Sequence, residues 1–220
     1  FLVIPRKFSP RFVYASSTKA DRMKIICVGR NYADHIEELQ NERPSEPVLF
    51  LKPDTTIGQR NTPFYLPDFS SEIHYEIEII VRINRIGKHI QEQFAHKYYD
   101  QLSVGIDFTA RDLQNKLKSK GLPWEKAKAF DGAAVVGDWL PKGSFENLQQ
   151  LDFELTKNGN TVQQGNTQLM LYSIDHLIAY VSEYFTLKIG DILFTGTPAG
   201  VGPVKENDQL EGYLNGQKLL

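Results

Sequence analysis

Hydrophobic and polar positions alternate most clearly between residues 71 and 81. Read with the two-residue period of a β-strand, the apolar face consists of Ile73, Tyr75, Ile77, Ile79 and Val81. The opposite face consists of Glu72, His74, Glu76 and Glu78. Because β-branched residues dominate and the run ends in three consecutive aliphatic residues, the pattern predicts a strand that continues into a covered interior.

The acidic face of this strand raises a question of charge. The Cα atoms of Glu76 and Glu78 lie about 7 Å apart at the rise of a strand, so their carboxylates repel each other unless a cation lies between them. Side chains at this spacing can converge on a hard divalent ion that takes oxygen ligands. The alternative is an edge strand whose acidic face lies in water.

Shorter apolar runs predict the remaining strands, at residues 23–29, 48–53, 102–109, 151–155, 161–163 and 191–195. The strand at 102–109 carries a third carboxylate, Asp107, and Asn158–Gly159 predicts a hairpin turn. The strongest helix is expected over residues 173–185, with Ser173 as its N-cap. Its apolar stripe consists of Ile174, Leu177, Ile178, Val181 and Phe185.

Two shorter helices are expected, over residues 33–39 and over residues 110–119, the second capped by Thr109. In the first, His35 and Glu38 are three residues apart and therefore neighbours on one face. One interpretation is a general-base pair, in which the carboxylate orients an imidazole that takes up a proton near neutral pH. The other is an incidental pair on a surface helix.

Two loops contain candidate chemistry. Residues 124–132 predict a loop with two lysines, Lys126 and Lys128, and the pattern does not choose between them. The glycine-rich run at 196–202 is not a phosphate loop, because no Gly-Lys-Ser/Thr follows it and no helix is predicted there. It either presents backbone amides and the Thr197 hydroxyl to an anion or is a plain turn between strands.

Composition bounds the class of protein. A chain of 220 residues with 41% hydrophobic content is long enough for one well-buried core. The net charge of −2 provides no broad basic surface, so neither a nucleic acid nor a membrane is expected as a partner. The single Cys27 excludes an internal disulfide framework and suits a reducing compartment.

The first 22 residues differ from the rest of the chain. They contain five Arg or Lys residues, no Glu and one Asp, together with several Ser. We therefore expect residues 1–22 to form an N-terminal extension outside the fold, and residues 23–220 to form a single catalytic domain. The extension is either a transit peptide or an upstream addition. The expected location is cytoplasmic, or an organellar matrix if the extension is a transit peptide.

Seven collinear segments can be compared with known families. They are Val-Gly-Arg-Asn-Tyr-Ala-Asp-His at 28–35, Glu-Pro-Val-Leu-Phe-Leu-Lys-Pro at 46–53, His-Tyr-Glu-Ile-Glu at 74–78, Asp-Phe-Thr-Ala-Arg-Asp-Leu-Gln at 107–114, Gly-Leu-Pro-Trp at 121–124, Lys-Ala-Phe-Asp at 128–131 and Thr-Gly-Thr-Pro-Ala-Gly-Val-Gly at 195–202. Together they resemble the fumarylacetoacetate hydrolase family, in particular its short single-domain members of the acylpyruvate hydrolase/oxaloacetate decarboxylase type. The resemblance implies an α+β fold, a mixed β-sheet-rich roll or sandwich of the fumarylacetoacetase C-terminal-domain type with a few helices. It also implies a homodimer.

The resemblance further implies a set of site residues. The metal ligands would be Glu76, Glu78 and Asp107, holding Mg²⁺ or Mn²⁺. The catalytic residues would be His35 and Glu38, on a mobile helix, and Lys128. The substrate-binding residues would be Arg30, Arg111, Gln114 and Thr197. Three carboxylates without a thiolate or a set of histidines also favour a hard ion over zinc on chemical grounds.

The activity implied is metal-dependent hydrolysis of the C–C bond of acylpyruvates, such as fumarylpyruvate or acetylpyruvate, to pyruvate and a carboxylic acid. The alternatives are an oxaloacetate decarboxylase or tautomerase and a 2-hydroxyhepta-2,4-diene-1,7-dioate isomerase, since all act on a small 2-oxo acid. A non-catalytic metal-binding or ligand-binding module is the alternative from a different class. His35, Glu38 and Lys128 argue against it, because a structural metal needs neither a base nor an extra cation.

Overall fold

The computed structural model describes residues 2–3, 23–38, 42–58 and 62–220. Its strands are β1 (Leu2–Val3), β2 (Lys24–Gly29), β3 (Val48–Pro53), β4 (Ile73–Tyr75), β5 (Ile77–Ile83), β6 (Tyr99–Asp107), β7 (Thr109–Ala110), β8 (Ala134–Val136), β9 (Leu140–Pro141), β10 (Asp152–Lys157), β11 (Asn160–Asn166), β12 (Ile192–Phe194), β13 (Gly202–Pro203), β14 (Gln209–Leu214) and β15 (Gln217–Lys218). Its α-helices are α1 (Ala33–Glu38), α2 (Glu92–Ala95), α3 (Arg111–Lys118), α4 (Glu125–Lys128) and α5 (Ile174–Tyr184). Short 3₁₀ turns are η1 (Asp54–Thr56), η2 (Lys142–Ser144) and η3 (Thr167–Leu169).

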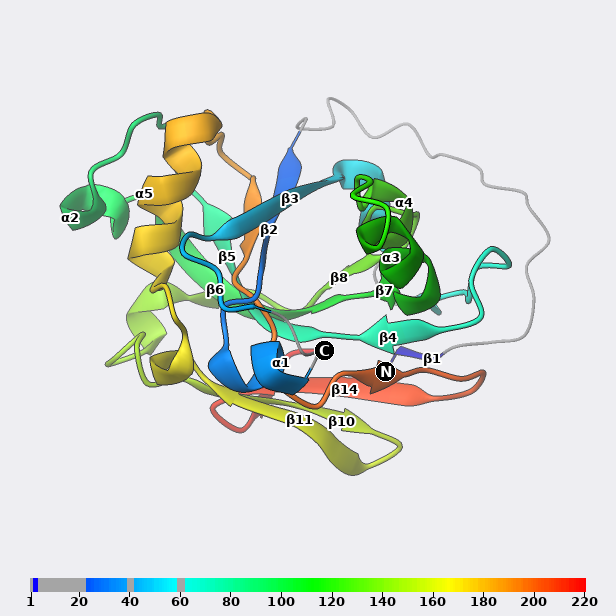
Figure 1. Ribbon diagram of the computed structural model, residues 1–220. Coiled ribbons are helices and arrows are strands. Elements are labelled where there is room, and N and C mark those ends of the chain that lie inside the picture. Colours follow the sequence, from blue (N-terminus) through cyan, green and yellow to red (C-terminus); the bar gives the residue numbers. More distant parts are fainter. Residues whose placement is uncertain (1, 4–22, 39–41, 59–61) are drawn as a thin grey trace, which may run out of the picture.

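A seven-stranded mixed sheet forms the centre of the molecule. Its order is β3-β2-β12-β5-β6-β8, and β9 pairs with β6. The β2–β12 pair is parallel, whereas β5 pairs antiparallel with both β12 and β6. Helices α5 and α2 lie to one side of β2, and α3 and α4 lie to the other (Figure 1). These sheets and the few helices confirm the expected α+β fold dominated by mixed sheets.

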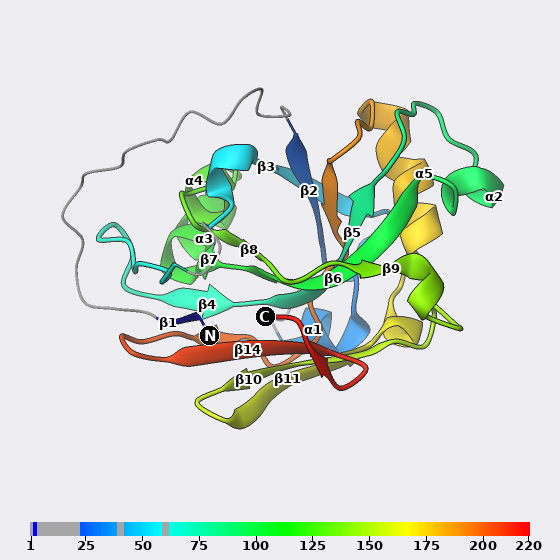
Figure 2. The same ribbon diagram turned by 180° about the vertical axis from the view of Figure 1, so that it is seen from behind.

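A five-stranded sheet, with the order β1-β14-β10-β11 and β15 paired with β14, forms a second layer below β4 and β6 (Figure 2). Aliphatic side chains from both layers, including Ile77, Val104, Leu155 and Leu214, pack in one core cluster. Strand β1 belongs to residues 1–22, which we expected to lie outside the fold. Its two residues, Leu2 and Val3, nevertheless pair with β14. Residues 1 and 4–22 lie outside the described residues.

The alternating run at 71–81 forms two strands instead of one. Residues 73–75 (β4) pair in a three-stranded sheet with β7 and β13, and residues 77–83 (β5) pair in the seven-stranded sheet. The paired segment passes between the same two sheets at the same level: β6 of the seven-stranded sheet ends at Asp107, and β7 of the three-stranded sheet begins at Thr109. A backbone hydrogen bond of 2.9 Å from the Asp107 amide to the Glu76 carbonyl joins the two crossings. Both faces of the run are buried from residue 75 to residue 81, so the exposed-edge alternative is wrong.

The helices follow their predicted ends with one exception. Ser173 caps α5 by accepting a hydrogen bond of 3.2 Å from the His176 amide, as expected. Thr109 does not cap α3; the N-cap position is Ala110, with no side-chain cap, and Thr109 lies in β7 with its side chain buried. The expected loop at 124–132 contains the single-turn helix α4. None of the helices described has both the length and the apolar character that a membrane crossing requires.

Gly105, near the end of β6, tests the packing of the central sheet. A Cβ atom at this position would lie 2.8 Å from both the Phe194 ring and the Val135 carbonyl oxygen. We expect Gly105→Ala to lower the free energy of unfolding by about 1–3 kcal/mol, because the backbone oxygen cannot move aside cheaply. Gly143→Ala, where a Cβ atom meets nothing within 4 Å, is the matched control and should change stability by under about 0.5 kcal/mol. Equal urea midpoints for the two variants would contradict this account.

Candidate metal centre and active site

Three buried carboxylates meet where the two strands change sheets. Glu76 lies between β4 and β5, Glu78 lies in β5, and Asp107 ends β6. One oxygen from each side chain lies within 4.8 Å of the others, and all three residues are buried. Strand alternation directs Glu76 and Glu78 to the same face, whereas Asp107 reaches them through the β5–β6 pairing.

Buried cations neutralise two of the three carboxylates. The Lys128 ammonium donates to Glu76 Oε2 and Asp107 Oδ2, both at 2.8 Å, and to Thr109 Oγ1 at 2.6 Å. Arg111 Nη2 lies 2.5 Å from Glu76 Oε1. Burial alone would raise the pKa of Glu76, but Lys128 and Arg111 outweigh it and hold the pKa of that carboxyl well below its usual value.

Glu78 has a different environment. Its Oε2 accepts a hydrogen bond of 2.6 Å from the Gly196 amide, and no cationic side chain among the described residues forms an ion pair with it. Burial and the charge of Asp107 raise the pKa of Glu78 well above its usual value. A divalent cation would supply the missing positive charge, so the three carboxylates fit a hard metal ion with oxygen ligands.

His35 and Glu38 form a pair on α1. His35 Nδ1 lies 3.1 Å from Glu38 Oε2, and Glu38 Oε1 accepts a hydrogen bond of 3.0 Å from the Gly200 amide. Only 6% of His35 is exposed, so this is not the incidental surface pair that we considered. Burial lowers the pKa of His35, against the opposing influence of Glu76 and Glu38, which favours the neutral imidazole. Because the carboxylate accepts from Nδ1–H, the lone pair of the ring lies on Nε2.

The other predicted residues lie around this centre at different depths. Arg111 and Gln114 are buried on α3, where Arg111 Nη1 donates to Gln114 Oε1 at 2.6 Å. Thr197 is buried in the glycine-rich loop and accepts a hydrogen bond of 2.9 Å from Gln163 Nε2. Of the two lysines that the sequence left open, Lys128 is buried in the centre and Lys126 is exposed.

Arg30 lies at the end of β2 with a positive φ of 61°, which is uncommon for a residue with a side chain. The next residue, Asn31, is fully buried and locks this turn. Its Nδ2 donates to the Tyr172 and Thr195 carbonyl oxygens at 3.1 Å and 2.8 Å. Burial and the charges of Arg30 and Arg111 lower the pKa of Lys118, so these cations share one region beside the centre.

Sequence reasoning missed four residues of the site. Lys52 Nζ lies 2.5 Å from Asp107 Oδ1. Thr109 donates a hydrogen bond of 2.9 Å to Glu76 Oε1. The side-chain amide of Gln163 links Ile77 to Thr197: its Oε1 accepts a hydrogen bond from the Ile77 amide, and its Nε2 donates one to the Thr197 hydroxyl. The Tyr32 hydroxyl is buried without a hydrogen-bond partner among the described residues, and burial together with the charge of Glu78 raises its pKa. The sequence signal that could have identified two of these residues is a polar residue in or next to an apolar run. Lys52 lies within the run at residues 48–53, and Thr109 directly follows the run at residues 102–108.

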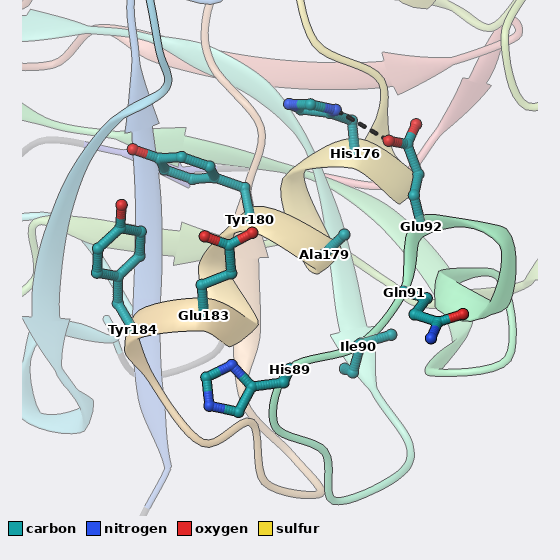
Figure 3. Close-up of a pocket in the computed structure, with 9 residues that line it drawn as sticks. All are labelled: His89, Ile90, Gln91, Glu92, His176, Ala179, Tyr180, Glu183 and Tyr184. Atoms are coloured by element: carbon teal, nitrogen blue, oxygen red, sulfur yellow. Dashed lines mark hydrogen bonds and ion pairs between the residues drawn. The ribbon is translucent and has the colours of Figure 1, made fainter.

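A groove of about 560 Å³ lies elsewhere, between α5 and the segment at residues 89–92 (Figure 3). None of the three carboxylates lines it. Its polar contact is the pair of His176 Nδ1 and Glu92 Oε2 at 3.1 Å, and both side chains are well exposed. His176 therefore belongs to the surface of the molecule.

Comparison with known proteins gives consistent results. Residues 24–218 match the family model described as fumarylacetoacetate (FAA) hydrolase C-terminal. The chain is 43% identical over 192 residues to "Oxaloacetate tautomerase FAHD1, mitochondrial" of Bos taurus, covering 87% of each chain. It is 41% identical over 197 residues to "Oxaloacetate tautomerase YcgM" of Escherichia coli (strain K12), covering 89% of this chain and 90% of the relative.

Among solved structures, a similar fold is found in a fumarylpyruvate hydrolase of Pseudomonas aeruginosa in complex with Mn²⁺ and pyruvate. Its TM-score is 0.85 at 30% identity, with 96% of each chain covered.

Two variants test the difference between the glutamates. With EDTA at pH 7.5, Glu76→Gln should lower the free energy of unfolding by roughly 3 kcal/mol, because it breaks buried ion pairs with Lys128 and Arg111. Glu78→Gln should leave it equal or higher. A raised pKa means that the contribution of Glu78 to stability is present below about pH 4.5 and lost as pH rises through the folded-state pKa.

Metal addition then tests whether Glu78 contributes to Mg²⁺ binding. Saturating Mg²⁺ at 100 times its dissociation constant should stabilise the wild type by about 2.7 kcal/mol and Glu78→Gln by less. Chemical denaturation with and without Mg²⁺ measures both changes in stability. If the metal-free Glu78→Gln protein is less stable than the wild type, the protein itself already stabilises the negative charge of Glu78, and our account of this residue is wrong.

Proposed function

Because this chain belongs to the fumarylacetoacetate (FAA) hydrolase family, we propose that it is a metal-dependent enzyme that interconverts the enol and keto forms of oxaloacetate. The observation that carries the proposal is a buried imidazole, oriented by a carboxylate and held beside a cluster of buried carboxylates and cations. Tautomerisation requires one proton to move between carbon and oxygen, and this pair is suited to that transfer. Two relatives above 40% identity have names that state this activity.

The metal is part of this proposal. Glu76, Glu78 and Asp107 would hold Mg²⁺ or Mn²⁺, and the bound ion would act as a Lewis acid toward the 2-oxo acid. Mn²⁺ is present in the related fumarylpyruvate hydrolase. The raised pKa of Glu78 supports the assignment, since its charge is the one that the protein leaves unpaired.

The proton is moved by residues of α1. In the keto-to-enol direction, His35 Nε2 accepts the proton from C3, and the C3–H electron pair forms the C2–C3 double bond. The carbonyl oxygen at C2 gains the negative charge and takes a proton from water, while the His35 imidazolium releases its proton to solvent and becomes neutral again. Glu38 holds Nδ1–H and stabilises the imidazolium that forms transiently. In the reverse direction the same ring nitrogen returns the proton to C3.

The remaining residues bind and orient the substrate. Lys128 is cationic, because Asp107 and Glu76 raise its pKa despite the opposing effect of burial. Its charge favours the oxyanion that develops at C2. Arg111 and Thr197 are the proposed carboxylate-binding residues, and the Gln163 bridge holds the Thr197 hydroxyl in place. Gln114 fixes the guanidinium of Arg111, and Arg30 lies at the outer side of this region.

Acylpyruvate hydrolysis is the second candidate, favoured by the likeness to fumarylpyruvate hydrolase. In that reaction His35 would deprotonate a water that attacks C4, and the C3–C4 electron pair would leave as the enolate of pyruvate. The same cations would stabilise this enolate. The two reactions therefore differ in whether a water is activated, and a substrate comparison separates them.

Two further expectations become proposals. We propose a homodimer because members of the family form homodimers. The molar mass in solution, measured by light scattering, tests this proposal. A mitochondrial location is proposed because a relative at 43% identity is named mitochondrial and because residues 1–22 are basic and contain Ser.

The substrate comparison uses oxaloacetate, acetylpyruvate and fumarylpyruvate, each with Mg²⁺ and with EDTA. We expect Mg²⁺-dependent loss of enol absorbance with oxaloacetate, without stoichiometric pyruvate release. Faster pyruvate release from an acylpyruvate would favour the hydrolase instead. Equal rates in EDTA would contradict the metal assignment for either reaction.

The pH profile tests the role of His35. Burial lowers the pKa of His35 below its usual 6.5, so kcat/KM should fall only below pH 6.5. Glu38→Gln removes the charge that raises this pKa and weakens the hydrogen bond to the ring, so the acidic limb should move to lower pH and kcat should fall. His35→Asn should cost about 100-fold or more. The control is His176→Asn, at the exposed pair in Figure 3, which should leave the profile unchanged. An acidic limb that stays in place in Glu38→Gln would exclude His35 as its origin.

A further inference from the structure

Lys52 is a buried cation that the proposed reaction does not use. It extends from β3, and its side chain is fully buried, with 0% exposed. Its Nζ lies 2.5 Å from Asp107 Oδ1 and donates a hydrogen bond of 2.8 Å to the Ala133 carbonyl oxygen. Removing an ammonium from water is costly, and a buried ion pair rarely recovers more than that cost. Stability alone is therefore a weak reason for a lysine at this position.

Lys52 differs from Lys128 in what it contacts. Lys128 bridges Glu76, Asp107 and Thr109 on the side of the carboxylate cluster. Lys52 pairs with Asp107 alone among the described carboxylates, through the opposite oxygen of that side chain. Because Lys52 has no exposed surface, it acts through Asp107 and is a positioning residue.

The contacts of the centre give a simple charge balance. As metal ligands the three carboxylates are ionised, so Glu76, Glu78 and Asp107 contribute −3. The cations in direct contact with them, Lys52, Lys128 and Arg111, contribute +3. With the metal bound, the protein groups therefore sum to zero. A divalent cation alone leaves the centre at +2, and a divalent cation together with a dianion returns it to zero.

Net charge in a buried region is costly, since the low effective dielectric strengthens every unbalanced interaction. We propose that Lys52 sets the charge of the centre so that a divalent cation and a dianionic 2-oxo acid bind cooperatively, each more tightly in the presence of the other. The coupling is reciprocal, as linkage requires. Without Lys52 the metal-loaded centre would carry +1 instead of +2, so it would retain the metal more readily without a dianion. This inference rests on the proposed metal site and substrate class.

The test measures Mn²⁺ binding by calorimetry with and without oxalate, a dianion with adjacent oxygens like those of a 2-oxo acid. In the wild type, saturating oxalate should tighten Mn²⁺ binding. Lys52→Met should bind Mn²⁺ alone at least tenfold more tightly than the wild type, and the gain from oxalate should shrink at least tenfold. Lys52→Arg, which keeps the charge, should retain the coupling of the wild type. Lys126→Met removes an exposed lysine nearby and should change neither quantity.

Two outcomes would overturn the inference. If Lys52→Met binds Mn²⁺ no more tightly than the wild type, or keeps the full gain from oxalate, Lys52 does not set the charge balance. This result leaves the proposed function standing, because the wild type still binds the metal. If the wild type binds no Mn²⁺, both the proposed function and this inference fail.

Folding of the variant does not limit the test. Should metal-free Lys52→Met fail to fold, it can be purified with Mn²⁺ bound, and the release of Mn²⁺ to excess EDTA can be followed. Release at least tenfold slower than from the wild type is expected. Release at the wild-type rate or faster would overturn the inference.

Discussion

The packing of like charges in a covered interior is the constraint on which this structure depends. One oxygen from each of Glu76, Glu78 and Asp107 lies within 4.8 Å of the others, in residues with almost no exposed surface. Such an arrangement persists only when cations offset it. Lys128 and Arg111 hold Glu76, and Lys52 and Lys128 hold Asp107. Because buried ion pairs contribute little to net stability, the centre is best explained by chemistry.

The scaffold meets this constraint by moving two strands from one sheet to another at the same level. The break between β4 and β5 places Glu76 outside the regular ladder, and the break between β6 and β7 does the same for the chain after Asp107. Thr109, just beyond that break, then reaches both Glu76 and Lys128. The crossing therefore brings acceptors, donors and charges together on short, well-paired segments that hold their geometry.

The proton-transfer pair is held by contacts from distant parts of the chain. Glu38 joins α1 to the glycine-rich loop through the Gly200 amide, and Asn31 joins the end of β2 to residues 172 and 195. Gly196 has a φ of +104°, and a Cβ atom there would lie 2.7 Å from Asn31 Cβ. The close approach of these two turns requires glycine. It places the Gly196 amide against Glu78 and so connects the imidazole region to the carboxylates.

Local pattern and chemistry determined much of this protein from sequence alone. Alternation put Glu76 and Glu78 on one face, helical spacing paired His35 with Glu38, and the cap and apolar stripe of α5 were correct. These features depend on neighbours within a few residues, and short-range sterics and periodicity decide them.

Only the tertiary structure decided that the acidic strand divides between two sheets and that Thr109 is a site residue instead of a cap. It also decided that Lys52 pairs with Asp107 and that Glu78 has no cationic partner among the described residues. Those facts depend on which distant segments meet and on how many charges share one buried volume, and one-dimensional periodicity contains neither.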